Sequence, residues 1–134
     1  MHSDVRTYRT GDQFISDLTD DANAHVVGRG DGLLNIFVPH ATAGLALIEL
    51  HAGTEADLAA AVERLLPRSD IYAHRHGSQG HGRDHVLPAF TAPVLTLPVV
   101  QGRLPLGTWQ SIVLVDSNAD NPTRQVRYSF VAGS

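Results

Sequence analysis

The sequence predicts an α+β fold, with a mostly antiparallel β-sheet of about seven strands and two helices. Short apolar segments rich in strand-forming residues recur along the chain, and they do not alternate regularly with helical segments. The chain has 134 residues, 43% of them hydrophobic, which suffices for one core but not for two. We therefore expect residues 1–134 to form a single domain.

The first part of the chain favours a strand, a helix and a second strand. Residues 5–8 and the apolar run 33–38 have the composition of strands. Between them, residues 14–27 carry apolar side chains at positions 14, 18, 22 and 26, the spacing of one helix face. Asp17 or Thr19 is a candidate cap for this helix.

The middle of the chain contains the most clearly predicted helix. Residues 43–50 are a second apolar run, whose short length and Gly44 favour a strand. Residues 54–57 resemble a capping box, with Asp in place of the usual Glu. Apolar residues then follow at helical spacing until Pro67, where the helix is expected to end.

The last half of the chain begins with a segment that has no apolar periodicity. Residues 73–85 are polar and rich in Gly and His, which is typical of a functional or mobile loop. Three apolar segments follow, at 94–100, 111–115 and 125–131, and each has the composition of a strand.

Composition excludes several classes of function. The chain has no Cys and no Lys, so disulfides, thiolate metal sites, cysteine nucleophiles and lysine Schiff bases are ruled out. A net charge of −4 with scattered arginines argues against nucleic acid as a partner. No apolar stretch approaches the roughly 20 residues of a membrane span, and the polar N-terminus has no signal-peptide pattern. The expected location is the cytoplasm, without a membrane partner.

Two polar residues beside apolar strands are candidates for chemistry. His40 follows the strand 33–38 and is bordered by small residues that leave room beside it, although a core histidine bound to a carbonyl would fit equally well. Glu49 is the only acid between Asp31 and Glu55. Either it is buried and needs a metal, an Arg or a His, or it lies on the exposed face of an edge strand.

Histidines are concentrated in the middle of the chain. Six of the eight lie between His40 and His85. Four of them could supply imidazoles to a shared cation, although their spacing matches no zinc signature: His74, His76, His81 and His85. His76 and His81 are expected to be exposed loop residues, whereas His74 and His85 are better anchored by their neighbours. Three imidazoles with an open position would suit Zn²⁺, which could activate water or hold an anion.

A glycine-rich reversal between two late strands is a candidate anion site. Gly102 and Gly107 allow backbone N–H groups to point at an anion, and Arg103 adds a bidentate donor. The same pattern fits a tight hairpin whose Trp109 packs in the core, and both interpretations can hold together. Arg124 is a second candidate anion ligand.

These blocks together resemble one known family. The first block is His40-x-Thr42-Ala43 with Glu49, followed by Tyr72-Ala73-His74 and by His85 ahead of an apolar strand. The second is Gly-Arg at 102–103 with Leu-Gly-Thr-Trp-Gln at 106–110, which is the most specific part. Over nearly the whole chain, the sequence resembles the YjbQ-like family, an uncharacterised family associated with secondary thiamine-phosphate synthase activity.

The resemblance implies a small α+β homotrimer with a metal or anion pocket. It implies a reaction in which a pyrimidine diphosphate and a thiazole phosphate are joined and pyrophosphate is released. Carried over residue by residue, it implies metal ligands His40, His74 and His85, catalytic roles for Glu49 and His40, and anion-binding roles for Arg103, Gly107, Thr108 and Arg124. The implied cofactor is a divalent metal, Zn²⁺ or similar, or Mg²⁺ for the synthase reaction.

The chain departs from the family pattern at polar positions. Leu50 and Ala52 replace Asn and Asp near Glu49, Leu87 replaces a lysine, and His81 replaces an Asn or Asp. The three histidines are retained, so the metal site is better preserved than the synthase chemistry. Three hypotheses follow: a metal-assisted transferase or hydrolase of a phosphorylated small molecule, a non-catalytic metal- or ligand-binding trimer, and a structural domain without a small ligand.

Overall fold

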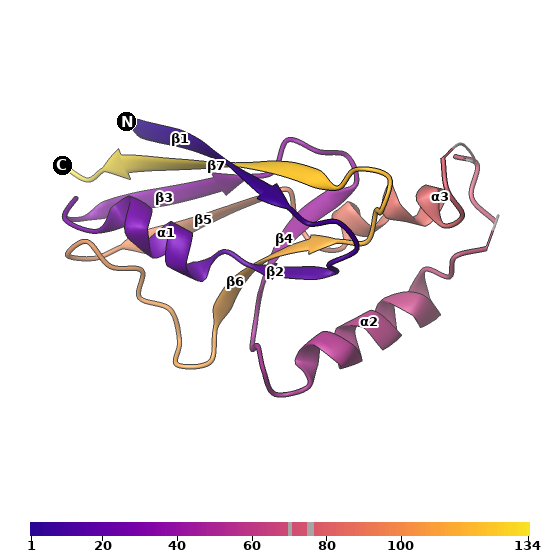
Figure 1. Cartoon of the computed structure of the whole chain (residues 1–134). Helices are drawn as coiled ribbons and strands as arrows, with labels where there is room; N and C mark the ends of the chain where they lie inside the picture. The colour runs from indigo at the N-terminus through magenta and orange to yellow at the C-terminus, as the bar shows by residue number, and fades with distance from the viewer. Residues whose placement is uncertain (70, 75–76) are drawn as a thin grey trace.

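The computed structural model describes residues 1–69, 71–74 and 77–134, and it confirms the predicted α+β class. In this part of the chain the strands are β1 (His2–Arg9), β2 (Ile15–Asp17), β3 (Gly32–Phe37), β4 (Ala43–Ile48), β5 (Val94–Val99), β6 (Ser111–Asp116) and β7 (Thr123–Ala132) (Figure 1). The helices are α1 (Thr19–Val26), α2 (Thr54–Leu65), the short α3 (His81–Asp84) and a 3₁₀ turn at Leu87–Ala89.

The strands form two antiparallel sheets. The larger sheet has the order β1-β7-β3-β5, and the smaller has the order β2-β6-β4. Within the larger sheet Leu34 lies opposite Leu97 on one side and Phe130 on the other. Strand alternation then places Leu34, Ile36, Val126 and Tyr128 in the interior, where each is fully buried.

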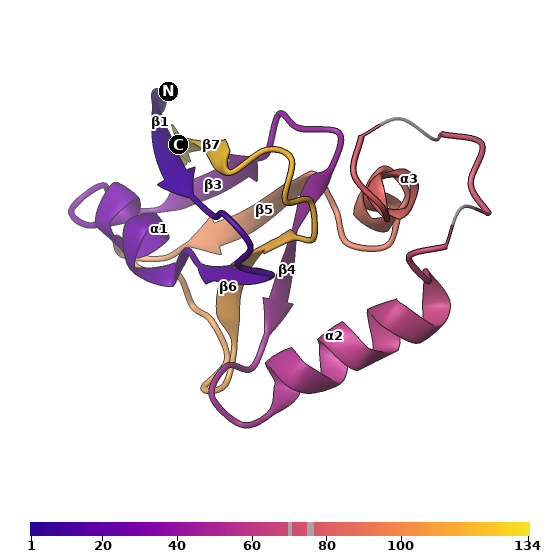
Figure 2. The ribbon, with the colours of Figure 1, turned by 45° about the vertical axis from the view of Figure 1, so that its right-hand side comes forward.

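Two hydrophobic cores lie on opposite faces of the smaller sheet. On one face, Leu45, Ile112 and Leu114 pack with α1 and the larger sheet. On the other face, Val113 and Val115 pack with α2 and the chain that follows it. Figure 2 shows α1 and α2 on opposite sides of β6 and β4. Because both faces are covered, β6 is a nearly continuous apolar run instead of an alternating one.

The predicted helix over residues 14–27 is shorter than expected. Ile15–Asp17 pairs with β6 as strand β2, and the helix begins only at Thr19. The carboxylate of Asp17 accepts a hydrogen bond from the backbone N–H of Thr19 at 2.9 Å, next to Leu18 at the N-cap. Pairing with β6 therefore prevailed over helical periodicity at positions 14 and 15.

The start of α2 also differs from the prediction. Its N-cap is Gly53, in a left-handed conformation with φ of +91°, and no side chain caps the helix. The carboxylate of Glu55 instead accepts a hydrogen bond from the backbone N–H of His51 at 2.6 Å. The capping box expected at residues 54–57 is therefore not formed.

Two further features differ from what the sequence alone indicated. The non-periodic segment 73–85 contains the helix α3, which the sequence did not predict. Trp109 is 72% exposed, so it does not pack in the core as one interpretation required. None of the described helices is long and apolar enough to cross a membrane.

We expect truncation of a buried leucine to lower the free energy of unfolding far more than truncation of an exposed leucine. Replacing the fully buried Leu34 with Ala should lower the free energy of unfolding by about 2–5 kcal/mol, because it leaves a cavity. Leu65→Ala is the matched control, since Leu65 is 60% exposed on α2 and its truncation should cost below about 0.5 kcal/mol. Urea denaturation of both variants checks this, and equal losses would contradict the assigned core.

Candidate metal centre and adjoining pocket

Two glycines shape the segment that presents the histidines. Gly80 adopts φ of +87° at the N-cap of α3, a conformation that other residues rarely adopt. A side chain at Gly82 would lie 2.4 Å from the carbonyl oxygen of His74. Gly82 therefore allows the chain around His74 to approach the backbone of α3 closely.

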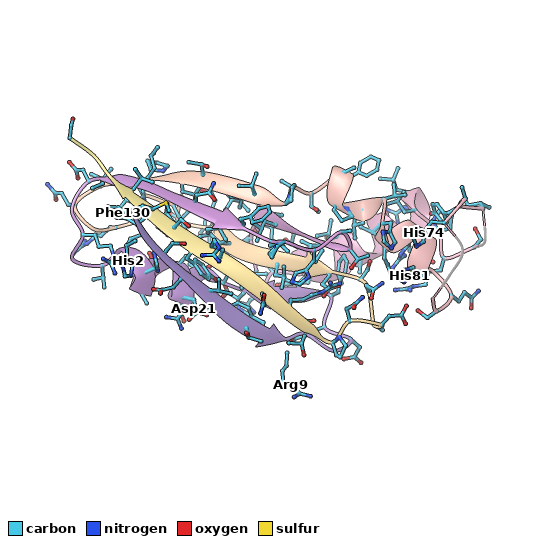
Figure 3. The ribbon with its side chains drawn as sticks, turned by 90° about the horizontal axis from the view of Figure 1, so that it is seen from above. His2, Arg9, Asp21, His74, His81 and Phe130 are labelled. Atoms are coloured by element: carbon cyan, nitrogen blue, oxygen red, sulfur yellow. The ribbon has the colours of Figure 1, made fainter. Side chains whose placement is uncertain are left out.

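This local structure gathers three imidazoles. His81 begins α3 and His85 follows its last residue, so their spacing of four places them on the same side of the turn. The ring of His74 lies 3.9 Å from that of His85 and 5.1 Å from that of His81, centroid to centroid. One donor nitrogen of each histidine lies within 4.8 Å of the other two. Figure 3 shows His74 and His81 near each other at one end of the molecule.

A carboxylate orients the imidazole of His81. Oδ2 of Asp120 lies 2.9 Å from Nδ1 of His81 and also accepts a hydrogen bond from the backbone N–H of Ser78 at 3.0 Å. The Ser78 N–H, and to a lesser degree His81, hold the pKa of Asp120 below its usual value. The side-chain amide nitrogen of Asn118 also lies 3.0 Å from Nδ1 of His81, and Nε2 of His81 lies 3.0 Å from Nε2 of His85.

Buried polar groups hold α3 in place. The carboxylate of Asp84 is 1% exposed and accepts hydrogen bonds from the hydroxyl of Ser117 and the amide of Asn118. Arg83 is buried as well and donates to Glu63 at 2.7 Å and to the carbonyl of Leu66. These contacts attach α3 to the β6–β7 connection and to α2, which fixes the positions of two of the three histidines.

A pocket of about 350 Å³ adjoins the cluster. His81 and His85 form part of its wall together with Pro39, His40, Ala41, Thr42, Asn121 and Arg124. Nε2 of His40 accepts a hydrogen bond from the backbone N–H of Gln125 at 2.9 Å. Burial, and then the charge of Arg124, lower the pKa of His40, so its imidazole is neutral at pH 7 with the proton on Nδ1.

Arg124 is held by a buried ion pair. Its Nε and Nη2 donate to both carboxylate oxygens of Asp116, at 2.6 and 3.0 Å, and Nη2 also donates to Thr42 at 2.7 Å. Arg124 and Asp116 are 2% and 4% exposed. The charge of Arg124 is thus largely balanced by Asp116 while the residue still borders the pocket.

The remaining predicted site residues lie elsewhere in the chain. Ile48 pairs with Ser111, so the exposed Glu49 lies at the end of the smaller sheet where the β5–β6 connection arrives. Arg103, Gly107 and Thr108 belong to that connection and are exposed. The other end of the same strands carries the pair Ala43 and Asp116, beside the pocket. With six residues in β4, the two ends are roughly 16 Å apart (Figure 1).

The structure therefore divides the sequence-predicted residues into two groups. His40, His85 and Arg124 line the pocket and His74 lies beside His85, whereas Glu49, Gly107 and Thr108 lie near the opposite end of the smaller sheet and Arg103 lies beside the end of β5. His81 was expected to be an exposed loop residue, but it is 8% exposed and belongs to the cluster. Its position four residues before His85 was the sequence signal for this role. His76 lies outside the described residues.

Comparisons with known proteins assign nearly the whole chain to one family. The family model described as "UPF0047 protein YjbQ-like" matches residues 4–133. A UPF0047 protein of Mycobacterium tuberculosis is 58% identical, covering 99% of this chain and 100% of that protein. A UPF0047 protein of Archaeoglobus fulgidus is 30% identical, covering 84% of this chain and 87% of that protein.

Solved structures show the same fold. A hypothetical protein from Aeropyrum pernix superposes with a TM-score of 0.89 at 26% identity, covering 99% of this chain and all of that one. A protein of unknown function from Sulfolobus solfataricus gives the same TM-score and identity, covering 98% and 97% of the two chains.

We expect the fold beside the pocket to depend on the carboxylate of Asp116. Asp116→Asn should lower the free energy of unfolding by about 3–5 kcal/mol, because it leaves the buried guanidinium of Arg124 without a counter-charge. Asp12→Asn, at an exposed aspartate, is the control and should change the free energy by less than about 0.5 kcal/mol. A loss below about 1 kcal/mol in chemical denaturation of Asp116→Asn would be inconsistent with this assignment.

Proposed function

The chain belongs to the YjbQ-like family UPF0047, as its motifs predict, and we propose that it is a metal-dependent enzyme of the thiamine-phosphate synthase type. The substrate class is a phosphorylated small molecule. The observation that carries the proposal is the cluster of His74, His81 and His85, two of which (His81 and His85) line a pocket together with His40 and Arg124.

The donor set fits a divalent transition metal. Three imidazole nitrogens with a fourth position open towards a pocket are the ligands of many catalytic zinc sites. The carboxylate of Asp120 on Nδ1 of His81 is the outer support that metal-bound histidines usually have. Imidazole favours Zn²⁺ over Mg²⁺, so Mg²⁺ would enter only together with the phosphates of a substrate. When bound, the cation would supply positive charge to stabilise a departing pyrophosphate.

The chain's own residues in the pocket suit an anionic substrate. His40 keeps its Nδ1 proton as a donor, because its Nε2 accepts the N–H of Gln125. Arg124 adds positive charge at the pocket wall, although Asp116 balances most of it. We assign both residues to binding and orienting a phosphate group.

A homotrimer explains why the family-derived positions lie in two groups. In a cyclic trimer each interface is heterologous, so one end of a chain meets a different part of its neighbour. Such an assembly would bring Glu49 and Arg103 of one chain to the histidine pocket of the next. The 72% exposed Trp109 lies in the same connection as Arg103 and is an apolar group suited to such an interface.

A non-catalytic metal-binding trimer is the second candidate. Within one chain, Glu49 is exposed and lies at the opposite end of β4 from the pocket, so no carboxylate base from this position reaches it. The histidine cluster alone would then fasten the segment 73–85 without a reaction.

The metal site is tested by elemental analysis of the untagged protein and two variants. His85→Ala should lose about one equivalent of transition metal per chain, since it removes one of three donors. His51→Ala is the matched control, because His51 is an exposed histidine outside the cluster, and it should retain the metal. Pyrophosphate release from a pyrimidine diphosphate and a thiazole phosphate, assayed on the same samples, tests the reaction.

The outcomes separate the two candidates. Metal loss in His85→Ala together with loss of pyrophosphate release supports the enzyme. Metal loss without any pyrophosphate release in the unaltered protein supports the non-catalytic trimer. Equal metal content in all three proteins would refute the site.

The shared site is tested by disrupting the assembly. Trp109→Arg should reduce the mass measured by light scattering from about three chains towards one. It should also abolish pyrophosphate binding in calorimetry while leaving the metal content unchanged, because the histidine cluster lies within one chain. Leu65→Arg, at an exposed leucine on α2, should preserve both the mass and the binding. Pyrophosphate binding by dissociated Trp109→Arg would contradict a site between subunits.

A further inference from the structure

A second group of metal-ligating side chains lies away from the pocket, where β1 begins and α1 ends. His2 and Asp4 belong to β1, and His25 lies in the last turn of α1. One donor atom of each lies within 4.8 Å of the other two. Figure 3 shows His2 at the opposite end of the molecule from His74 and His81.

The strand period places two of these side chains above the helix. His2 lies opposite Phe130 and Asp4 lies opposite Tyr128, both of which are buried on the inner face of the larger sheet. Residues two apart on a strand share a face, so His2 and Asp4 point inward, towards α1. His25 meets them from the helix, with its ring 4.9 Å from that of His2 and 6.0 Å from that of Tyr128.

Hydrogen bonding fixes the proton of the buried imidazole. Nε2 of His25 lies 3.1 Å from the backbone carbonyl oxygen of His2. A carbonyl only accepts, so Nε2 carries the proton and Nδ1 has the lone pair. The side chain of His25 is 3% exposed, so its ring is almost entirely shielded from solvent.

The lone pair of His25 then faces a carboxylate. Oδ2 of Asp4 lies 3.7 Å from Nδ1 of His25 and 3.1 Å from Nε2 of His2. With the proton of His25 on the other nitrogen, two electron-rich atoms face each other across a distance longer than a hydrogen bond. A cation between them would satisfy both.

We propose that His2, Asp4 and His25 form a second metal site, which binds a divalent late transition metal such as Zn²⁺. With metal–ligand distances of about 2.0–2.2 Å, tetrahedral ligand atoms lie roughly 3.3–3.6 Å apart. The two distances from Asp4, 3.1 and 3.7 Å, bracket that separation, and the ligand atoms of His2 and His25 lie within 4.8 Å of each other, so side-chain rotations would bring all three to a shared ion. Two imidazoles and one carboxylate select Zn²⁺, Ni²⁺ or Cu²⁺ over Mg²⁺ or Ca²⁺ and leave a fourth position for water.

This site would connect an edge strand to a helix. In the larger sheet β1 pairs only with β7, and α1 packs beneath the same sheet. An ion held by His2 and Asp4 from the strand and by His25 from the helix therefore fastens the two together. Because the folded state alone presents all three ligands, metal binding should stabilise it.

The test uses the untagged full chain and the double variant His2→Gln/Asp4→Asn. Both side chains are largely exposed, at 44% and 59%, so the variant should fold like the unaltered protein. In Zn²⁺ titration calorimetry the variant should bind about one ion fewer per chain than the unaltered protein. Zn²⁺ should also raise the melting temperature of the variant less than that of the unaltered protein.

The matched control is His51→Gln/Asp12→Asn, which removes an exposed histidine and an exposed aspartate outside both clusters. It should keep the stoichiometry and the thermal shift of the unaltered protein. Identical Zn²⁺ stoichiometry and thermal shift in both double variants would overturn the proposal. The difference in Zn²⁺ binding between the two double variants does not depend on the three-histidine cluster. The second site can therefore be refuted while the His85→Ala test supports the first site, and the reverse.

Discussion

The ion pair between Arg124 and Asp116 is the contact on which the pocket end of the molecule depends. Arg124 belongs to β7 of the larger sheet and Asp116 ends β6 of the smaller one, so the pair joins the two sheets. Thr42, ahead of β4, accepts a hydrogen bond from Arg124, and Thr10, after β1, donates one to Asp116. Four segments thus converge on two buried charges, which are stable there because each is balanced and hydrogen-bonded.

The same polar network continues to the histidines. Asp116 accepts the backbone N–H of Asn118 at 3.0 Å, and the Asn118 amide donates to Asp84 in α3. Asp120, two residues further along, holds His81. The β6–β7 connection is therefore the element that sets the distance between the sheets and the imidazole cluster. A change in this connection would therefore be expected to move His81 and the cluster that it belongs to.

The sequence predicted the strands better than it predicted the site. Strands β3 and β4 were predicted because each is a short run of apolar residues, the pattern of a strand buried in a sheet. The helix over 14–27 was predicted too long, since the spacing that suggests a helix also allows Ile15 to pair with Val115. The role of His81 depends on Asp120, 39 residues away, and no local pattern encodes that contact. The positions of Glu49 and Arg103 relative to the pocket likewise depend on how the strands pair in the two sheets, which no local pattern encodes.

The two groups of family-derived positions also bear on how substrate and metal could be coupled. In one chain the imidazole cluster is complete, whereas Gly107 and Thr108 of the β5–β6 connection lie near the other end of the smaller sheet and Arg103 lies beside the end of β5. In the proposed homotrimer, metal binding would be a property of the chain and phosphate binding a property of the assembly. Affinity for the phosphorylated ligand would then fall with dilution of the protein, because ligand binding and association are linked. Affinity for the metal would not, since all of its donors belong to one chain.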